Sequence, residues 1–156
     1  MYLSEHFTLQ EATTSDTAAR KGINNSSPPK EVKEVLYRTA TRLEKVRLIL
    51  KSPIHINSWY RCPELNSLLG SKSTSQHILG EAVDFICPQY GSPVEVCKAI
   101  IKETGLIRFD QLILEHTWIH ISWKYDPNIP QRGEVLSLLQ DGSYTKGLTS
   151  PTGIHY

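Results

Sequence analysis

The chain has 156 residues, of which 17 are Lys or Arg and 16 are Asp or Glu, so its formal net charge is +1. This length is typical of one domain with its own hydrophobic core, and we expect a single domain over residues 1–156. The near-zero charge excludes the strongly basic surfaces that bind nucleic acid or anionic membranes without regard to sequence.

The N-terminal third of the chain is predicted to be helical. Thr8, followed three residues later by Glu11, matches a capping box, and Gly22 is a suitable end for the short helical segment that starts there. Residues 24–29 form a loop rich in turn formers that ends in two prolines. Apolar residues then recur at helical spacing, which predicts a long helix over residues 30–51.

Strands and helices alternate in the middle of the chain. Ser92, Pro93 and Glu95 supply an N-cap, a first-turn proline and a capping-box acid for a helix that should end at Gly105. The elements expected in this region are a strand at 53–57, a short helix from Pro63 to Leu69 closed by Gly70, a strand from Ala82 to Ile86 and a helix over about 93–104.

The C-terminal part is predicted to consist of strands. Residues 111–114 and 118–123 are mainly apolar, and they are expected to form two strands that pair through a tight turn near His116. A last hairpin over residues 135–144, around Asp141-Gly142, should complete the sheet. Because helices mostly precede strands that are joined by hairpins, we expect an α+β fold, an antiparallel sheet with helices packed on it.

The cysteines and the distribution of apolar residues indicate the compartment in which the chain is made. Cys62, Cys87 and Cys97 are odd in number and lack the spacings of a zinc ribbon or a disulfide framework, so reduced thiols are expected. The N-terminus lacks a basic segment followed by an apolar run, and no stretch approaches about 18 apolar residues. We therefore expect synthesis in the cytoplasm without a signal peptide, and no stable membrane insertion.

Two histidines and one aspartate are the candidate metal ligands. His77 precedes the expected second strand and Asp84 lies within it, and Gly80 between them allows the loop to turn back. His120 stands between two isoleucines that alternate to the opposite face of its strand, so its imidazole should face a cleft. Two imidazoles and a carboxylate leave the fourth tetrahedral position for water, which is typical of a catalytic zinc site.

The complete pattern is Ser-x-His-x-x-Gly-x-Ala-x-Asp over residues 75–84, followed by Trp-x-His over residues 118–120. This pattern resembles the zinc D-Ala-D-Ala carboxypeptidase family, which also includes vancomycin-resistance D,D-dipeptidases and the L-alanyl-D-glutamate endopeptidases of phage lysins. The family shares its fold with the Hedgehog signalling domain. The resemblance implies that His77, Asp84 and His120 are the zinc ligands.

The resemblance extends to the segment Ile56–Asn66, which is similar to the family's Ser-Gly-Tyr-Arg-Ser-Pro-x-Leu-Asn. It implies that Arg61 anchors a substrate carboxylate or carbonyl, for which the planar fork of guanidinium donors is suited. Trp59 stands where glycine is common and Cys62 where serine is common, so both are expected to reshape the substrate-entry side beside Arg61. Two further stretches resemble the family more loosely, Phe7–Glu11 and Arg132–Leu136.

The expected general base departs from the family pattern. Familiar members place an acid three residues before the last histidine, where this chain has Thr117. Glu115 is the nearest acid, five positions before His120, and a turn can return its carboxylate to the metal site. His116 is the alternative, as a proton carrier or an oxyanion donor.

The resemblance implies a zinc-dependent peptidase that cuts bonds next to D-amino acids in peptidoglycan, either a D-Ala-D-Ala carboxypeptidase or an L-Ala-D-Glu endopeptidase. Its partners are expected to be peptidoglycan stem peptides, and the protein is expected to be a monomer. It should act on the bacterial cell wall, where a phage-type lysin would arrive by release through a membrane hole. The alternative is a non-catalytic, zinc-containing peptidoglycan-binding module of the same fold, and a metal-free structural protein would require the whole motif to be coincidence.

Overall fold

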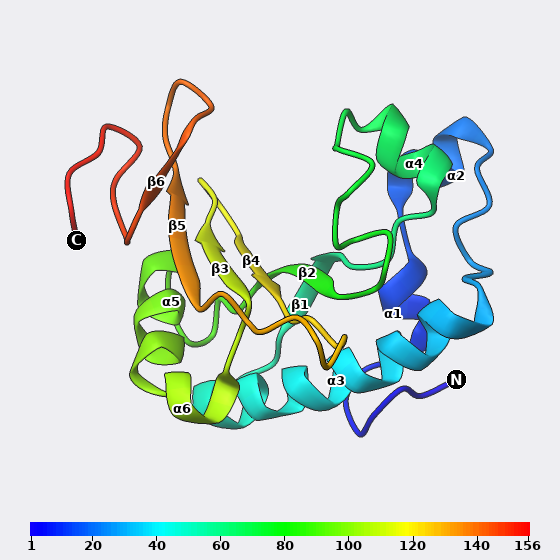
Figure 1. The fold of residues 1–156 in the computed structure, drawn as a ribbon, viewed down its shortest axis with the longest axis horizontal. Coiled ribbons are helices and arrows are strands. Elements are labelled where there is room, and N and C mark those ends of the chain that lie inside the picture. The colour runs from blue at the N-terminus through cyan, green and yellow to red at the C-terminus, as the bar shows by residue number, and fades with distance from the viewer.

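The computed structural model describes residues 1–156, and its centre is a six-stranded sheet with helices around it (Figure 1). The helices are α1 (Leu9–Thr13), α2 (Asp16–Lys21), α3 (Lys30–Leu50), α4 (Pro63–Leu68), α5 (Pro93–Lys102) and α6 (Thr104–Ile107). The strands are β1 (His55–Ser58), β2 (Ala82–Ile86), β3 (Gln111–Leu114), β4 (Ile119–Ser122), β5 (Glu134–Leu138) and β6 (Tyr144–Lys146). Helices α1, α2 and α4 gather near one end of the sheet, α5 and α6 near the other, and α3 spans the distance between the two groups (Figure 1).

The N-terminal helices follow from their caps. The Thr8 hydroxyl accepts from the Glu11 backbone N–H at 3.1 Å, and the Glu11 carboxylate accepts from the Thr8 N–H at 3.1 Å, which is the expected capping box. The single helical segment expected here is two helices, because the Ser15 side chain accepts from the Ala18 N–H and caps a second one. That second helix ends, as expected, at Gly22.

The region after the fifth helix corrects one expectation. Gly105 does not end a helix: α5 finishes at Lys102, and Gly105 lies inside the short helix α6. Ile107, at the end of α6, is 1 % exposed, so its burial in the core outweighs the low helix propensity of glycine. Arg108 closes this helix in the left-handed conformation, at φ 48°.

The sheet has the order β1-β2-β4-β3-β5-β6 and confirms the expected α+β class. Antiparallel pairing joins every neighbouring pair except β3 and β5, which run parallel. The sheet is thus mostly antiparallel, as expected, and the parallel β3–β5 pair is a feature that the sequence did not indicate. After β4 the chain returns as a connection over residues 123–133 to the start of β3, and β5 consequently begins beside Gln111.

The core beneath the sheet is one cluster of 25 buried residues to which α3, α5 and the strands all contribute. Ile119 and Ile121 of β4 are 0 % exposed, so the side chain between them, that of His120, faces away from this layer. The core thus fixes the strand and presents the histidine on the other face of the sheet. No helix of the structure has the length and apolar character needed to cross a membrane.

Candidate metal centre

His77 lies in the loop between α4 and β2, and a backbone carbonyl fixes its orientation. Its Nδ1 is 2.7 Å from the carbonyl oxygen of Trp59. A carbonyl only accepts hydrogen bonds, so Nδ1 carries the proton and Nε2 keeps its lone pair. Nε2 faces the Asp84 carboxylate, at 3.3 Å from Oδ2. The buried imidazole is therefore set in the tautomer that a metal ligand requires.

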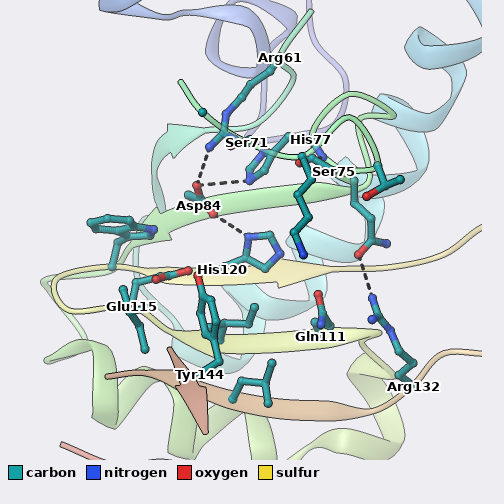
Figure 2. Close-up of a pocket in the computed structure, with 18 residues that line it drawn as sticks. Arg61, Ser71, Ser75, His77, Asp84, Gln111, Glu115, His120, Arg132 and Tyr144 are labelled. Atoms are coloured by element: carbon teal, nitrogen blue, oxygen red, sulfur yellow. Dashed lines mark hydrogen bonds and ion pairs between the residues drawn. The ribbon is translucent and has the colours of Figure 1, made fainter. Parts of the chain in front are cut away.

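Asp84 and His120 are brought together by strand pairing. They are opposite each other in the β2–β4 register, and His120 Nδ1 lies 2.9 Å from Asp84 Oδ1. The rings of His77 and His120 meet edge to face with centroids 5.3 Å apart. Figure 2 shows the three side chains converging on one point in front of the sheet.

The loop that carries His77 depends on Gly80. This residue has φ +77°, a left-handed conformation that glycine adopts without strain. A Cβ at this position would lie 2.9 Å from Cδ2 of Leu36. The Gly80 carbonyl accepts from the Trp59 indole at 3.0 Å and from the Thr39 hydroxyl at 2.9 Å, so the loop is pinned to α3 and to the segment after β1.

The three side chains fit a zinc ion. One ligand atom from each of His77, Asp84 and His120 lies within 4.8 Å of the others. Tetrahedral ligands at about 2.0–2.1 Å from zinc are themselves about 3.4 Å apart, so these atoms need only small adjustments. Burial opposes the ionised form of Asp84, but the two histidines outweigh it and hold the pKa of this carboxyl well below its usual range. A carboxylate and two imidazoles are a donor set that zinc prefers.

Arg61 lies directly beside this centre. Its guanidinium donates to Asp84 Oδ2 at 3.3 Å, to the Ser71 hydroxyl at 3.1 Å and, through Nε, to the Ser58 hydroxyl at 3.1 Å. These contacts hold the positive charge in one place next to the candidate ligand. Burial lowers the pKa of Arg61 and the charge of Asp84 raises it.

Glu115 reaches the same site from the turn between β3 and β4. The Glu115 N–H donates to the Trp118 carbonyl at 3.0 Å, and this tight turn returns the side chain toward the metal centre. The residue is 8 % exposed, and this burial raises the pKa of its carboxyl. The negative charge of Asp84 raises this pKa further. Figure 2 shows Tyr144 of β6 pointing its hydroxyl toward this carboxylate. The interaction with Tyr144 lowers the Glu115 pKa, in part offsetting burial.

A cavity of about 720 Å³ is lined by every predicted site residue except His116. His116 is exposed and does not line the cavity, whereas Glu115 does. Tyr144 could not be predicted from the sequence, because only the β5–β6 hairpin brings it to the site and no local motif marks it. The lining residues come from the segments on either side of α4, from the sheet with its β3–β4 turn and β4–β5 connection, and from the last hairpin: Arg61, Gly70, Ser71, Lys72, Thr74, Ser75, Gln76, His77, Asp84, Gln111, Ile113, Glu115, Trp118, His120, Arg132, Leu136, Leu138 and Tyr144.

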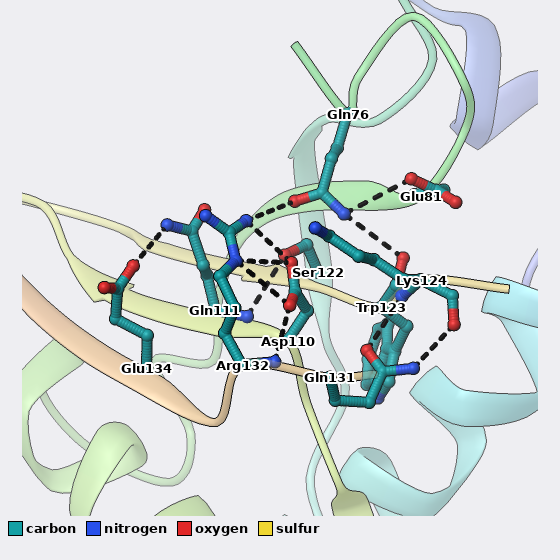
Figure 3. Close-up of polar contacts among 10 residues, drawn as sticks. All are labelled: Gln76, Glu81, Asp110, Gln111, Ser122, Trp123, Lys124, Gln131, Arg132 and Glu134. Carbon is teal, nitrogen blue, oxygen red and sulfur yellow. Dashed lines mark hydrogen bonds and ion pairs between the residues drawn. The ribbon is translucent and has the colours of Figure 1, made fainter. Parts of the chain in front are cut away.

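Arg132 closes the end of the cavity away from Glu115 (Figure 2). Its guanidinium donates to both oxygens of Asp110, with the shortest contact at 2.7 Å, and its own backbone N–H donates to Asp110 at 2.8 Å. It also reaches the Gln76 side chain at 3.5 Å (Figure 3). Gln76 immediately precedes His77 and donates to Glu81, so the network ties the histidine loop to the connection that leads into β5.

Trp59 does not shape the substrate-entry side, which corrects the sequence expectation. It is 1 % exposed, and its ring packs edge to face on Phe7 with centroids 6.3 Å apart. Its effect on the site is indirect, through the carbonyl that holds His77. Cys62 likewise does not line the cavity and precedes α4 as its N-cap residue. All three cysteines are free, and burial raises the pKa of the Cys97 thiol to about 12.

Comparison with known proteins agrees with this arrangement. The family model described as peptidase M15 matches residues 5–122, a span that contains all three candidate ligands, Arg61 and Glu115. No curated protein sequence matches the chain significantly. The matched span covers well over half of the sequence, and its fold is the α+β fold of that family. The chain therefore belongs to the peptidase M15 family, the family of zinc metallopeptidases that includes the D-Ala-D-Ala carboxypeptidases.

Proposed function

We propose that the protein is a zinc peptidase that hydrolyses a peptide bond next to a D-amino acid in bacterial peptidoglycan. The observation that supports this proposal best is the convergence of His77, Asp84 and His120 in a cavity that also contains Glu115 and Arg61 (Figure 2). The proposed partners are peptidoglycan stem peptides, and the proposed place of action is the bacterial cell wall.

The three ligands would hold the zinc ion, which when bound supplies a Lewis acid that polarises a carbonyl and acidifies water. Glu115 is the proposed proton carrier. Burial beside Asp84 raises the pKa of its carboxyl toward the range in which general acid–base catalysis is efficient. It can take a proton from the attacking water and return it to the leaving amine.

Arg61 is proposed to orient the substrate. Hydrogen bonds from its guanidinium to Ser58 and Ser71 restrict the side chain, so little rotamer freedom is lost when a peptide binds. The guanidinium beside Asp84 offers a fixed hydrogen-bond donor for a carbonyl of the peptide. A reacting carbonyl that is held in one place meets the water more often than one that moves freely in the cavity.

The test is mass spectrometry of purified peptidoglycan fragments after incubation with the zinc-loaded protein. We expect new fragments whose masses identify a cut next to a D-amino acid. Glu115→Gln should keep zinc and lower the rate by about 10²-fold or more, the usual scale for loss of a general base. Glu34→Gln, a change of the same kind on the exposed side of α3, should behave as the wild type.

Two results would contradict the proposal. Muropeptides that bind to the zinc-loaded protein but are never cut would favour a non-catalytic zinc-containing binding module. Glu115→Gln with zinc bound and an unchanged rate would show that another group moves the proton.

A further inference from the structure

A second cavity adjoins the metal centre on the side of the helices. It has a volume of about 380 Å³ and lies between α2, α4 and the end of β1. Three residues, Arg61, Asp84 and Trp118, line both this helix-side cavity and the larger sheet-side cavity of about 720 Å³. Asp84 is a candidate zinc ligand, so the metal centre lies where the two cavities meet.

Both cavities are larger than a single terminal amino acid requires. Pockets that enclose a whole drug-sized ligand have volumes of about 300–1,000 Å³, and both cavities fall in this range. A carboxypeptidase needs a wall about one residue beyond the bond that it cuts, since an extended chain advances only about 3.3–3.6 Å per residue. A terminal D-Ala would leave most of either cavity empty.

The charges of the helix-side cavity also disfavour a chain terminus. A terminal carboxylate is held by a cation, and the only cation there is Arg61, which is already paired with Asp84 at 3.3 Å. The other charged residue that lines it is Asp16, which repels a carboxylate. The remaining lining is hydroxyl, amide and apolar, from residues such as Thr17 of α2 and Leu69 after α4.

From these observations we infer that the two cavities form one groove that binds a peptide chain on both sides of the scissile bond. The protein then cuts an internal bond of a longer peptide and does not remove a terminal residue. This inference rests on the proposed peptidase function and selects, within it, an endopeptidase.

The first experiment compares two stem peptides of the same sequence with the zinc-loaded protein. One has free ends, and the other is acetylated at its N-terminus and amidated at its C-terminus. We expect the same internal bond to be cut in both, at rates that agree within about threefold, because no contact with a free terminus is needed. Release of only the C-terminal residue from the free peptide, with the blocked peptide uncut, would overturn the inference and leave the peptidase function intact.

A second readout does not depend on catalysis. The blocked peptide is added to zinc-loaded Glu115→Gln protein, and backbone NMR shifts are followed at Thr17 for the helix-side cavity and at Gln111 for the sheet-side cavity. Shifts at both sites support the groove even if no peptide is ever cut, in which case only the proposed peptidase function fails. Shifts confined to the sheet-side residue would overturn the groove.

Filling the helix-side cavity tests its use directly. Thr17→Tyr on α2 and Leu69→Trp at the end of α4 should each raise KM for the long peptide at least about fivefold, with a smaller change in kcat. A peptide shortened from the end that occupies this cavity should be cut equally well by variant and wild type. Thr41→Tyr, on the exposed face of α3 and outside both cavities, is the matched control. An unchanged KM in both filled variants, each with the thermal stability of the wild type, would contradict the inference.

Discussion

Tyr144 belongs to the candidate site but not to the part of the chain that the family model matches. It lies outside the matched span 5–122, yet its hydroxyl faces the Glu115 carboxylate (Figure 2). Burial and the charge of Glu115 both raise the pKa of Tyr144, so it stays protonated near neutral pH and acts as a donor. The C-terminal hairpin thus contributes a side chain to the candidate site as well as strands to the sheet.

Tyr144→Phe removes this donor and leaves the ring. We expect kcat/KM to fall by about 2–12-fold, the loss that corresponds to a net hydrogen bond of about 0.5–1.5 kcal/mol. The interaction lowers the pKa of Glu115, so its loss should raise that pKa and move the acidic limb of the pH–rate profile to higher pH. Rate profiles of the two proteins between pH 4 and pH 9 check this, and an acidic limb that stays in place would contradict the role of the hydroxyl.

The ligands and their neighbours differ in how well the sequence predicts them. His77, Asp84 and His120 are predicted mainly because the whole motif resembles that of the zinc carboxypeptidase family, and the strand pairing places Asp84 opposite His120. The return of Glu115 also follows from the expected turn. The role of the Trp59 carbonyl does not, because a backbone atom carries it and side-chain identity gives no signal.

At the scale of the elements, the loop that presents His77 offers a controlled comparison of two glycines. Gly80 and Gly70 both have φ +77°, but a Cβ would meet Leu36 at 2.9 Å in the first case and nothing within 4 Å in the second. Gly70→Ala should lower the free energy of unfolding by about 1–2 kcal/mol, the cost of a left-handed backbone for alanine. Gly80→Ala adds the steric conflict, so it should cost more and also weaken zinc binding by displacing His77.

Denaturant unfolding and zinc titration of the two variants measure these effects. The same loss of stability in both, with equal zinc affinity, would show that the close approach to α3 has no part in holding the histidine.

The connection between β4 and β5 depends on an ion pair between buried Asp110 and exposed Arg132, which the sequence did not indicate. Asp110 is 0 % exposed and accepts from the guanidinium and the backbone of Arg132 (Figure 3). Burial raises the pKa of Asp110, but the hydrogen bonds and charge of Arg132 outweigh it and lower the pKa. Its partner lies 22 positions away, across the connection that makes β3 and β5 parallel. This long separation explains why local patterns missed both the pair and the parallel register.

The lowered pKa of Asp110 predicts a pH dependence of stability. The native state favours the carboxylate more than the unfolded state does, so the contribution is fully present above about pH 4, near the ordinary Asp pKa. It is lost as the pH falls through the lower native value. Asp110→Asn should cost about 1.5–3 kcal/mol at pH 7, typical of hydrogen bonds to a charged group, and less at pH 3. A difference from wild type that is the same at both pH values, measured by denaturant unfolding, would contradict this account.

For the molecule as a whole, the sequence predicted the fold class and most element positions because apolar periodicity and caps act locally. It missed what depends on distant contacts: the helix through Gly105, the parallel pair and the burial of Trp59. The single domain, the monomeric state and the cell-wall location stay predictions.

Bound zinc should stabilise the folded state, since its candidate ligands hold a loop and two strands together. A ligand that binds only the native state stabilises it by about 4 kcal/mol at a free concentration 1,000 times its Kd. In a domain of this size, each kcal/mol raises Tm by about 2–4 °C, so removal of the metal by a chelator should lower Tm by about 8–16 °C.

Calorimetric scans of wild type with zinc and with chelator measure the difference. His120→Ala should lose most of the zinc-dependent shift, whereas His55→Ala, an exposed histidine of β1 outside the centre, should keep it. A full zinc-dependent shift in His120→Ala would exclude His120 as a ligand even if the enzyme were otherwise as proposed.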